Sequence, residues 1–155
     1  MNEKFGNWFS GLVDGEGCFS LPVPSKYTIP HPRFDLTMRA DDIRMLEQIK
    51  STLGFGQIYS RKHGYKNSQG YTSKLLASYV VWNKSDTLKL VELFREFPLR
   101  SKKSRDFTLW AEAVEIWNLH KYGRWADTPE TLPLKERMRE LAVLIKDIRV
   151  YVPPD

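Results

Sequence analysis

Hydrophobic positions recur along this chain in two periods, and these periods predict its helices and strands. Apolar side chains near the N-terminus follow the three-and-four spacing of a helix, and a strand-like alternation begins after Gly17. The same two patterns then repeat along the sequence. The predicted helices cover residues 5–16, 41–54, 85–97, 105–122 and 134–150, and the predicted strands cover 19–23, 33–39, 56–62 and 76–82.

The ends of these elements carry local signals. Gly54 is expected to end the second helix, and Ser85 or Asp86 is expected to cap the third. Pro22 and Pro24 cannot donate hydrogen bonds to a neighbouring strand, so the first strand should lie at a sheet edge. The expected buried stripes are Phe5, Trp8, Phe9, Leu12 and Val13; Ile43, Leu46, Ile49 and Leu53; Leu88, Val91, Leu93 and Phe94; Phe107, Trp110, Val114 and Trp117; and Leu141, Leu144, Ile145 and Ile148.

The order of elements predicts an α+β fold with an αββαββα core and an extra C-terminal helix. A four-stranded antiparallel sheet with helices on one face is the economical arrangement, because every apolar helix stripe then has somewhere to pack. We expect residues 1–155 to form a single domain, since this length suffices for one hydrophobic core. The other face of the sheet is left open.

Composition narrows the possible classes of protein. Hydrophobic residues make up 41% of the chain, which excludes a disordered protein, and no apolar run approaches the ~20 residues of a membrane span. The N-terminus lacks a signal-peptide pattern and Cys18 is the single cysteine, so we expect an intracellular protein that is not secreted. The net charge of +5 favours a polyanionic partner, although many basic proteins bind no nucleic acid.

The end of the first helix is unusual. Gly11 and Gly15 lie four apart and share one helix face, which suggests that another backbone approaches closely there. Asp14 and Glu16 lie where the helix dipole disfavours anions, which suggests a cation or phosphate chemistry. A calcium-binding loop does not fit, because Cys18 occupies the next ligand position, and the three histidines are too scattered for a zinc site.

Residues 9–17 resemble the LAGLIDADG motif of homing endonucleases, with Glu16 in place of the motif's last aspartate. The resemblance implies a site-specific endonuclease that makes a metal-dependent, staggered double-strand break in a long, roughly palindromic DNA target. It assigns Glu16 to the metal, which is expected to be Mg²⁺, with Mn²⁺ or Ca²⁺ as alternatives. Asp14 is expected to support the motif by hydrogen bonding, with direct metal ligation as the alternative. No small-molecule cofactor is implied.

The resemblance extends to a basic segment after the third helix. The family has a lysine between a Pro-Leu and an Asp-Phe-like pair, and this chain has residues 98–99 and 106–107 in that frame. Lys103 fits the distance to the second pair and Lys102 fits the distance to the first, so both are candidate catalytic residues. Some relatives have a glutamine where this chain has Met38 followed by Arg39, and Arg39 is a possible substitute.

The outward-facing strand residues are predicted to bind DNA. Antiparallel strands fit the major groove, where each base pair presents its own pattern of donors and acceptors. An ordinary polar sheet face is the alternative interpretation. The candidates for base contacts are Ser20, Arg33, Asp35, Thr37, Gln57, Tyr59 and Arg61, and those for phosphate contacts are Lys26, Arg39, Lys62 and Lys66.

The chain contains one copy of the motif. Family members with one motif form homodimers, so the resemblance predicts a dimer whose axis passes by Trp8, Gly11, Leu12 and Gly15. The predicted partners are double-stranded DNA and a second copy of the chain, with intron RNA as a further candidate. The predicted location is a bacterial cytoplasm or an organelle. The rival function is an RNA-splicing maturase or a DNA-binding regulator that has the fold without cleavage.

Overall fold

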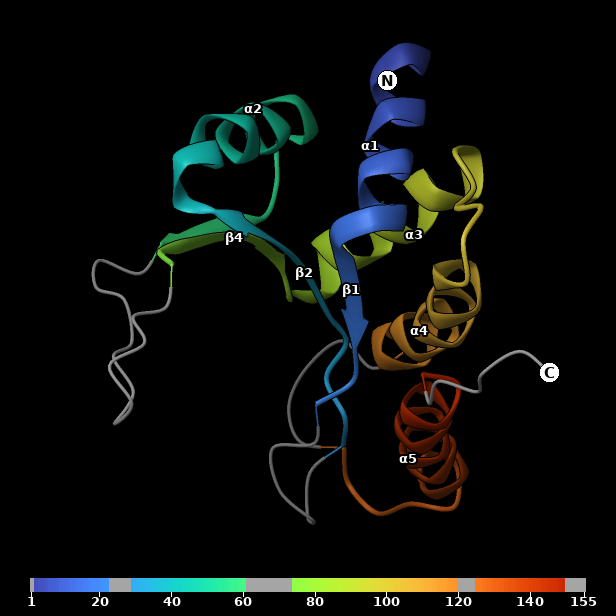
Figure 1. The fold of residues 1–155 in the computed structure, drawn as a ribbon. Helices are drawn as coiled ribbons and strands as arrows, with labels where there is room; N and C mark the ends of the chain where they lie inside the picture. Colours follow the sequence, from blue (N-terminus) through green and yellow to red (C-terminus); the bar gives the residue numbers. More distant parts are fainter. Residues whose placement is uncertain (1, 23–28, 61–73, 120–124, 150–155) are drawn as a thin grey trace, which may run out of the picture.

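Helices and strands alternate in the first half of the chain, and helices alone follow in the second (Figure 1). The structure is a computed structural model that describes residues 2–22, 29–60, 74–119 and 125–149. The helices are α1 (Glu3–Glu16), α2 (Ile43–Leu53), α3 (Lys84–Glu96), α4 (Lys103–Asn118) and α5 (Thr131–Asp147), with a short 3₁₀ helix η1 (Ala40–Asp42). The strands are β1 (Gly17–Ser20), β2 (Arg33–Arg39), β3 (Gln57–Ser60) and β4 (Leu76–Val81).

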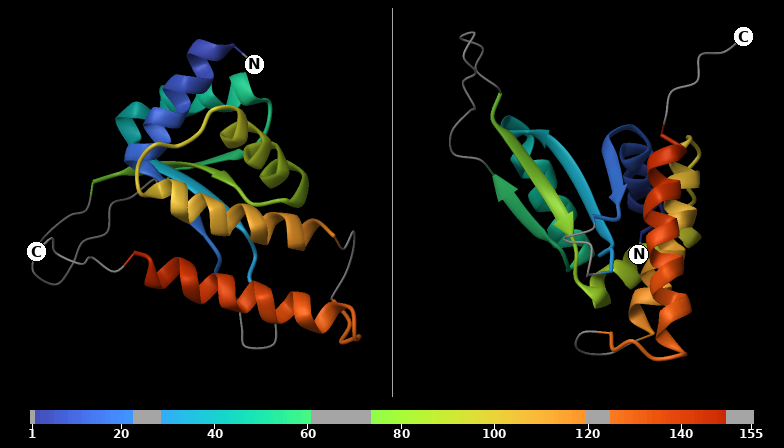
Figure 2. Two further views of the ribbon diagram at one scale, coloured as in Figure 1. Left: turned by 90° about the vertical axis from the view of Figure 1, so that its right-hand side faces the viewer. Right: turned by 90° about the horizontal axis from the view of Figure 1, so that it is seen from below.

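The four described strands form one antiparallel sheet in the order β1-β2-β4-β3. The α+β prediction is therefore confirmed, and β1 lies at an edge as its flanking prolines required. The α4 and α5 helices pair as an antiparallel hairpin, and they lie side by side in both views of Figure 2. The α5 helix thus packs on a helix rather than directly on the sheet.

One hydrophobic core joins the helices to a single face of the sheet. Phe34 and Leu36 of β2 are fully buried, whereas Arg33 and Thr37 point to the other face and are exposed. The centre of the core is aromatic, with the Phe19 ring 5.2 Å from Phe34 and 5.3 Å from Trp110 between ring centroids. The strand parity read from the sequence is therefore correct.

Two glycines shape the turn between α2 and β3. Gly54 ends α2 in the left-handed conformation with φ 75°, and this confirms the predicted helix end. Gly56 has φ 82°, and a Cβ there would lie 2.5 Å from the ring of Tyr79. The Tyr79 hydroxyl donates to the Phe55 carbonyl at 3.0 Å, so the turn is closed over this ring.

Several predicted details are wrong. The α3 helix is capped by Asn83, whose side chain accepts from the backbone N–H of Asp86, rather than by Ser85 or Asp86. The β1 strand ends at Ser20 and does not continue through Leu21. On α5, Leu144 and Ile148 are exposed, because α4 covers the side of α5 that carries Met138, Leu141 and Ile145; on α1, Trp8 is 43% exposed. None of the described helices is long and apolar enough to cross a membrane.

Candidate functional site

The α1 helix runs into β1 with no connecting loop. Glu16 is the last residue of α1, and Gly17 is the first of β1 and pairs with Leu36 of β2. The Gly17 N–H donates to the carbonyl of Val13, and a Cβ on Gly17 would lie 2.5 Å from a Val13 methyl group. This abrupt change of direction needs a glycine, and it leaves the exposed Glu16 side chain at the corner between helix and sheet.

Asp14 joins the end of α1 to the segment before α4. Its two carboxylate oxygens accept the backbone N–H groups of Arg100 at 2.8 Å and Ser101 at 3.0 Å. Burial alone would raise the pKa of Asp14, but these hydrogen bonds outweigh it and hold the pKa below the usual 3.8. Both oxygens are thus engaged by protein donors, which supports the interpretation of Asp14 as a supporting residue.

Lys103 makes the reciprocal contact. This first residue of α4 donates from Nζ to the carbonyl oxygens of Gly15 at 2.7 Å and Val13 at 3.3 Å. Its positive charge therefore lies at the carbonyl end of α1, where the helix dipole favours a cation. Partial burial lowers the pKa of Lys103 and outweighs the nearby carboxylates, including Glu16. We call the paired contacts of Asp14 and Lys103 the α1–α4 clasp.

The contacts of the clasp distinguish between the two candidate catalytic lysines, Lys102 and Lys103. The Lys103 ammonium lies on the backbone carbonyl of the residue before Glu16. Lys102 precedes α4 and its side chain is exposed. Geometry therefore favours Lys103 as the lysine of the site, and the catalytic role of either residue stays a prediction.

A contact from α5 reaches the same region. Arg149, just beyond α5, donates from Nε to Oδ2 of Asp106 at 2.8 Å and also donates to the carbonyl of Phe19. It thereby fastens the first turn of α4 to the outer edge of β1. No local sequence pattern identifies this residue, because it lies 130 positions from Phe19 in the chain.

The open face of the sheet carries most of the predicted base-contact residues. Arg33 and Asp35 form a two-bond ion pair at 2.7 Å, and Arg39 pairs with Asp41 at 2.7 Å in the same way. Thr37 is hydrogen-bonded to Ser78 of β4 at 2.8 Å. Ser20, Gln57 and Tyr59 also lie on this face. Lys26, Arg61, Lys62 and Lys66 lie outside the described residues.

Sequence reasoning missed the contribution of β4 to this face. Because β4 lies between β2 and β3, Ser78 stands opposite Thr37 on one side and Tyr59 on the other. Val80 stands between Asp35 and Gln57 in the same way. Ala77 and Tyr79 belong to the core on the other face, whereas Ser78 is half-buried and Val80 is buried on this face.

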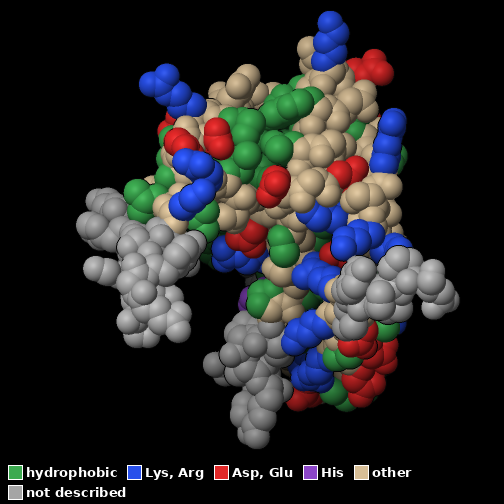
Figure 3. Space-filling view, viewed as in Figure 1, with side chains coloured by type: hydrophobic (Ala, Val, Ile, Leu, Met, Phe, Trp, Pro, Cys, Tyr) green, Lys and Arg blue, Asp and Glu red, His purple; other side chains and the backbone are tan. Residues whose placement is uncertain are grey.

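The glycines of α1 serve two different sides of the helix. A Cβ on Gly6 would lie 2.5 Å from the ring of Phe97, so this glycine permits close packing inside the chain. Among the described residues, apart from the adjacent residues and the backbone of α1 itself, no atom lies within 4 Å of the positions that a Cβ would take at Gly11 or Gly15. Trp8 and Leu12 are at least partly exposed, and Figure 3 shows apolar side chains gathered over α1 and α2. This side of α1 is open in the single chain.

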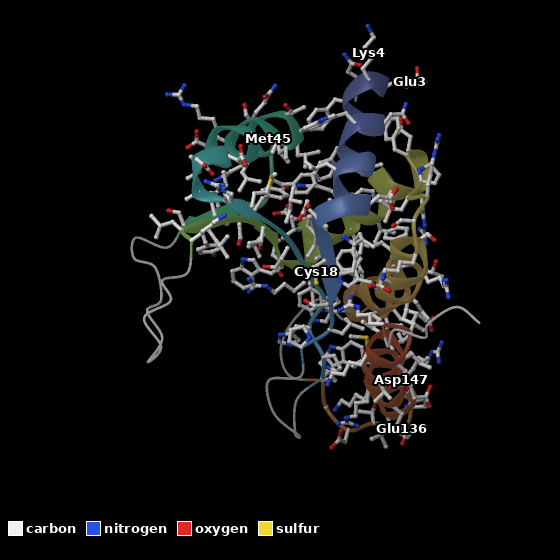
Figure 4. All side chains as sticks on the ribbon, viewed as in Figure 1. Glu3, Lys4, Cys18, Met45, Glu136 and Asp147 are labelled. Atoms are coloured by element: carbon white, nitrogen blue, oxygen red, sulfur yellow. The ribbon has the colours of Figure 1, made fainter. Side chains whose placement is uncertain are left out.

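Among the described residues, no three His, Cys, Asp or Glu side chains come together as a metal site. The exposed carboxylate of Glu16 nevertheless fits Mg²⁺. This ion binds proteins through one or two carboxylates and takes its other ligands from phosphates and water. Cys18, two residues beyond Glu16 and labelled in Figure 4, is exposed on the open face.

A sequence model of the family described as LAGLIDADG endonuclease matches residues 9–114, from within α1 to within α4. The chain belongs to the LAGLIDADG endonuclease family. The match includes the α1–β1 corner, the whole sheet and both partners of the clasp, and it leaves out α5 with Arg149.

Two intron-encoded endonucleases of fungi are similar to the chain in sequence. The chain is 27% identical to a probable intron-encoded endonuclease, Cox1-I1b, of Schizosaccharomyces pombe over 97% of its own length and 35% of that protein. It is 31% identical to probable intron-encoded endonuclease 3 of Neurospora crassa over 68% of its length and 19% of that protein. The chain thus spans about a third or less of these relatives.

Solved LAGLIDADG structures confirm the fold. The meganuclease I-AabMI bound to uncleaved DNA aligns with a TM-score of 0.69 and 25% identity, and the match covers 99% of this chain and 47% of that one. The archaeal intron-encoded homing endonuclease I-Vdi141I, complexed with DNA, aligns with a TM-score of 0.71 and 21% identity over 99% of this chain and 91% of that one. The chain is therefore the size of some family members and half the size of others.

Proposed function

We propose that this chain is a site-specific DNA endonuclease that acts as a homodimer. The observation that carries the proposal is the α1–β1 corner, where an exposed Glu16 adjoins both the open sheet face and the open side of α1. Two copies joined along α1 bring two such carboxylates together, one for each DNA strand. The expected product is a staggered double-strand break within a long, roughly palindromic target.

Glu16 is the proposed ligand for a divalent cation, with Mg²⁺ favoured and Mn²⁺ or Ca²⁺ able to occupy the same site. When bound, such a cation neutralises phosphate charge and assists hydrolysis of the phosphodiester. Asp14 holds the corner in place through its two backbone hydrogen bonds. Lys103 fixes the Gly15 carbonyl and supplies positive charge beside Glu16, with Lys102 as the alternative catalytic lysine.

The open sheet face is the proposed recognition surface for duplex DNA. Its charged and hydroxyl side chains suit base edges in the major groove, and its basic residues suit phosphates. The Arg33–Asp35 pair is preorganised, since Asp35 holds the guanidinium by two hydrogen bonds. We expect Arg33→Ala to relax the preference at particular base pairs, and Lys66→Ala to weaken binding to all sequences evenly and lower its salt dependence.

The test is the substitution Glu16→Gln. It removes the charge needed to hold the cation and keeps the shape of the side chain. Double-strand cleavage of a target selected from a randomised DNA library should fall below detection, while target binding in Ca²⁺ or chelator stays within about threefold of wild type. Cleavage by Glu16→Gln at the wild-type rate would overturn the assignment.

The two fungal relatives are named as intron-encoded endonucleases, and the rival function is an RNA-splicing maturase or a DNA-binding regulator without cleavage. Wild-type protein that binds intron RNA and cuts no DNA with any divalent metal would favour this rival. Either function places the protein inside a cell, in a bacterial cytoplasm or an organelle.

A further inference from the structure

A second polar and aromatic site lies at the end of the sheet where β2 begins, next to the proposed DNA-facing residues. It is a cavity of about 440 Å³ between the start of β2, the end of β4 and the end of α4. Its lining includes His31, Arg33, Trp82, Asn83, Lys84 and Trp117. Trp117 lies beyond the last residue of the family match, whereas the other lining residues lie within it.

The cavity offers flat apolar surfaces. Trp82 has 54% of its surface exposed, although tryptophan is the side chain that gains most from burial. The His31 and Trp117 rings are stacked with centroids 5.4 Å apart and an interplanar angle of 27°, which fixes a second aromatic part of the lining. A lining with an exposed tryptophan and a fixed pair of rings suits one planar ring.

The charge of the lining is positive. Arg33 and Lys84 are the two charged residues that line the cavity among the described part of the chain, and no lining residue there is a carboxylate. Lys84 is held with Nζ 5.4 Å from the centre of the Trp117 ring, so its charge stays at the cavity. Arg33 is paired with Asp35, so its charge is partly offset, and Lys84 contributes the second positive charge of the lining.

The histidine is suited to stacking. Burial and the neighbouring Lys84 lower the pKa of His31, so the imidazole is neutral near pH 7. A neutral ring stacks beside a base without adding a charge that must be solvated. The polar edge of Asn83 adds amide donors and acceptors, although its side chain also caps α3 through Asp86.

We propose that this cavity binds one unpaired nucleotide, with its base against Trp82 and its phosphate near Lys84. Aromatic platforms beside basic side chains are the common means of holding single-stranded nucleic acid, because every base has a flat face to stack. A base within a duplex is already stacked on its neighbours and does not enter a cavity of this size. The site adjoins the sheet face proposed for duplex DNA and shares Arg33 with it, but binding there does not depend on cleavage.

The test measures binding of fluorescein-labelled 10-nucleotide oligouridine and oligothymidine to the full chain by anisotropy, in EDTA. Wild type should bind at least one of them, and Trp82→Ala should weaken that binding about tenfold, as expected for loss of one stacked base. Lys84→Gln should weaken it several-fold and flatten its salt dependence. Leu119→Ala removes another exposed apolar side chain near the end of α4, outside the cavity lining, and should bind as wild type does.

The two oligonucleotides distinguish the source of the nucleotide. Tighter binding of oligouridine identifies RNA, and tighter binding of oligothymidine identifies single-stranded DNA; either supports the cavity. Glu16→Gln should bind both as wild type does, so failure of the nuclease proposal leaves this result intact. Absence of binding by wild type, or equal binding by wild type and a folded Trp82→Ala protein, would overturn the proposal.

Discussion

Asp14 lies near the C-terminal end of α1, where the helix dipole disfavours a negative charge. Lys103 lies at the N-terminal end of α4, where the helix dipole disfavours a positive charge. Across the junction each charge meets the opposite helix end, because Asp14 accepts N–H groups that precede α4 and Lys103 donates to carbonyls that end α1. The two acidic residues of this segment therefore have different environments. Asp14 is engaged by the protein, whereas Glu16 faces solvent.

Asp14→Asn should lower the free energy of unfolding by about 1.5–3 kcal/mol, since hydrogen bonds to a charged acceptor are the stronger class. Urea denaturation at pH 7 measures the change. Asp41→Asn is the matched control, because Asp41 forms an exposed ion pair with Arg39 and should cost less than about 1 kcal/mol. Equal losses in the two variants would contradict a special role for the clasp.

The Asp14 contribution should also depend on pH. Its pKa in the folded chain lies below the usual 3.8, so the unfolded chain takes up the proton first as pH falls. The stabilisation is complete above the unfolded pKa and is lost as pH falls through the folded pKa. The difference in urea midpoint between wild type and Asp14→Asn should thus be constant from pH 7 to about 5 and shrink below about 4.

Lys103→Met and Lys102→Met should differ in their effects on the unfolding midpoint and on the cleavage rate. Lys103→Met removes the contacts with the Val13 and Gly15 carbonyls, so it should lower both the unfolding midpoint and the cleavage rate, the latter about 100-fold or more. Lys102→Met should leave the midpoint unchanged. Single-turnover cleavage and thermal melting of both variants make the comparison. A larger loss of cleavage in a stable Lys102→Met protein would transfer the catalytic role to Lys102.

At the scale of elements, α1 has glycines on two sides for two reasons. Gly6 faces Phe97 within the chain, while Gly11 and Gly15 face open space. Of these glycines, only Gly11 and Gly15 are available to contact a second chain. The exposed Trp8 extends the surface that they form.

Gly6→Ala and Gly11→Ala provide the matching test. Gly6→Ala forces a methyl group into the Phe97 ring and should destabilise the chain by about 1–3 kcal/mol. Gly11→Ala should stabilise α1 within the single chain by up to about 1 kcal/mol while raising the dimer dissociation constant about tenfold. Urea denaturation and sedimentation velocity separate the two effects. A Gly11→Ala protein that dimerises as wild type does would argue against this seam.

Local patterns in the sequence predicted most elements and not the contacts between them. The bounds of β2 and the end of α2 at Gly54 were correct because alternation and a left-handed glycine are local signals. The cap at Asn83 was missed because Ser85 and Asp86 carry the same chemistry two and three positions later. The Arg149 contacts with Asp106 and Phe19 depend on packing between distant segments, which no local pattern encodes.

The same limit applies to the candidate site. The motif located Asp14 and Glu16. Only the folded chain shows that Asp14 is hydrogen-bonded to the segment before α4 and that Glu16 is exposed to solvent. The sheet order determines that β4 stands between β2 and β3, so Ser78 joins the proposed recognition surface, whereas Val80 is buried. Strand order is a long-range property, and the sequence pattern left it open.

At the scale of the whole molecule, each chain of the proposed dimer cleaves one DNA strand. A mixture of wild type and Glu16→Gln, exchanged to form hybrid dimers, should therefore produce nicked DNA in place of linear DNA. Nicked and linear products of a supercoiled plasmid are resolved on an agarose gel. Wild type alone should linearise the plasmid and Glu16→Gln alone should leave it intact. Linear product in proportion to hybrid dimers would show that one Glu16 suffices for both strands.

The uninterrupted passage from α1 into β1 also constrains the DNA target. With no loop between the proposed dimer seam and the recognition strands, the two sheets of a dimer are held at a fixed separation and angle. One base pair inserted at the centre of the target moves its second half by about 3.4 Å and turns it by about 35°. The enzyme should thus tolerate several base substitutions in its target and reject a single central insertion, so its targets would diverge in sequence while keeping their length.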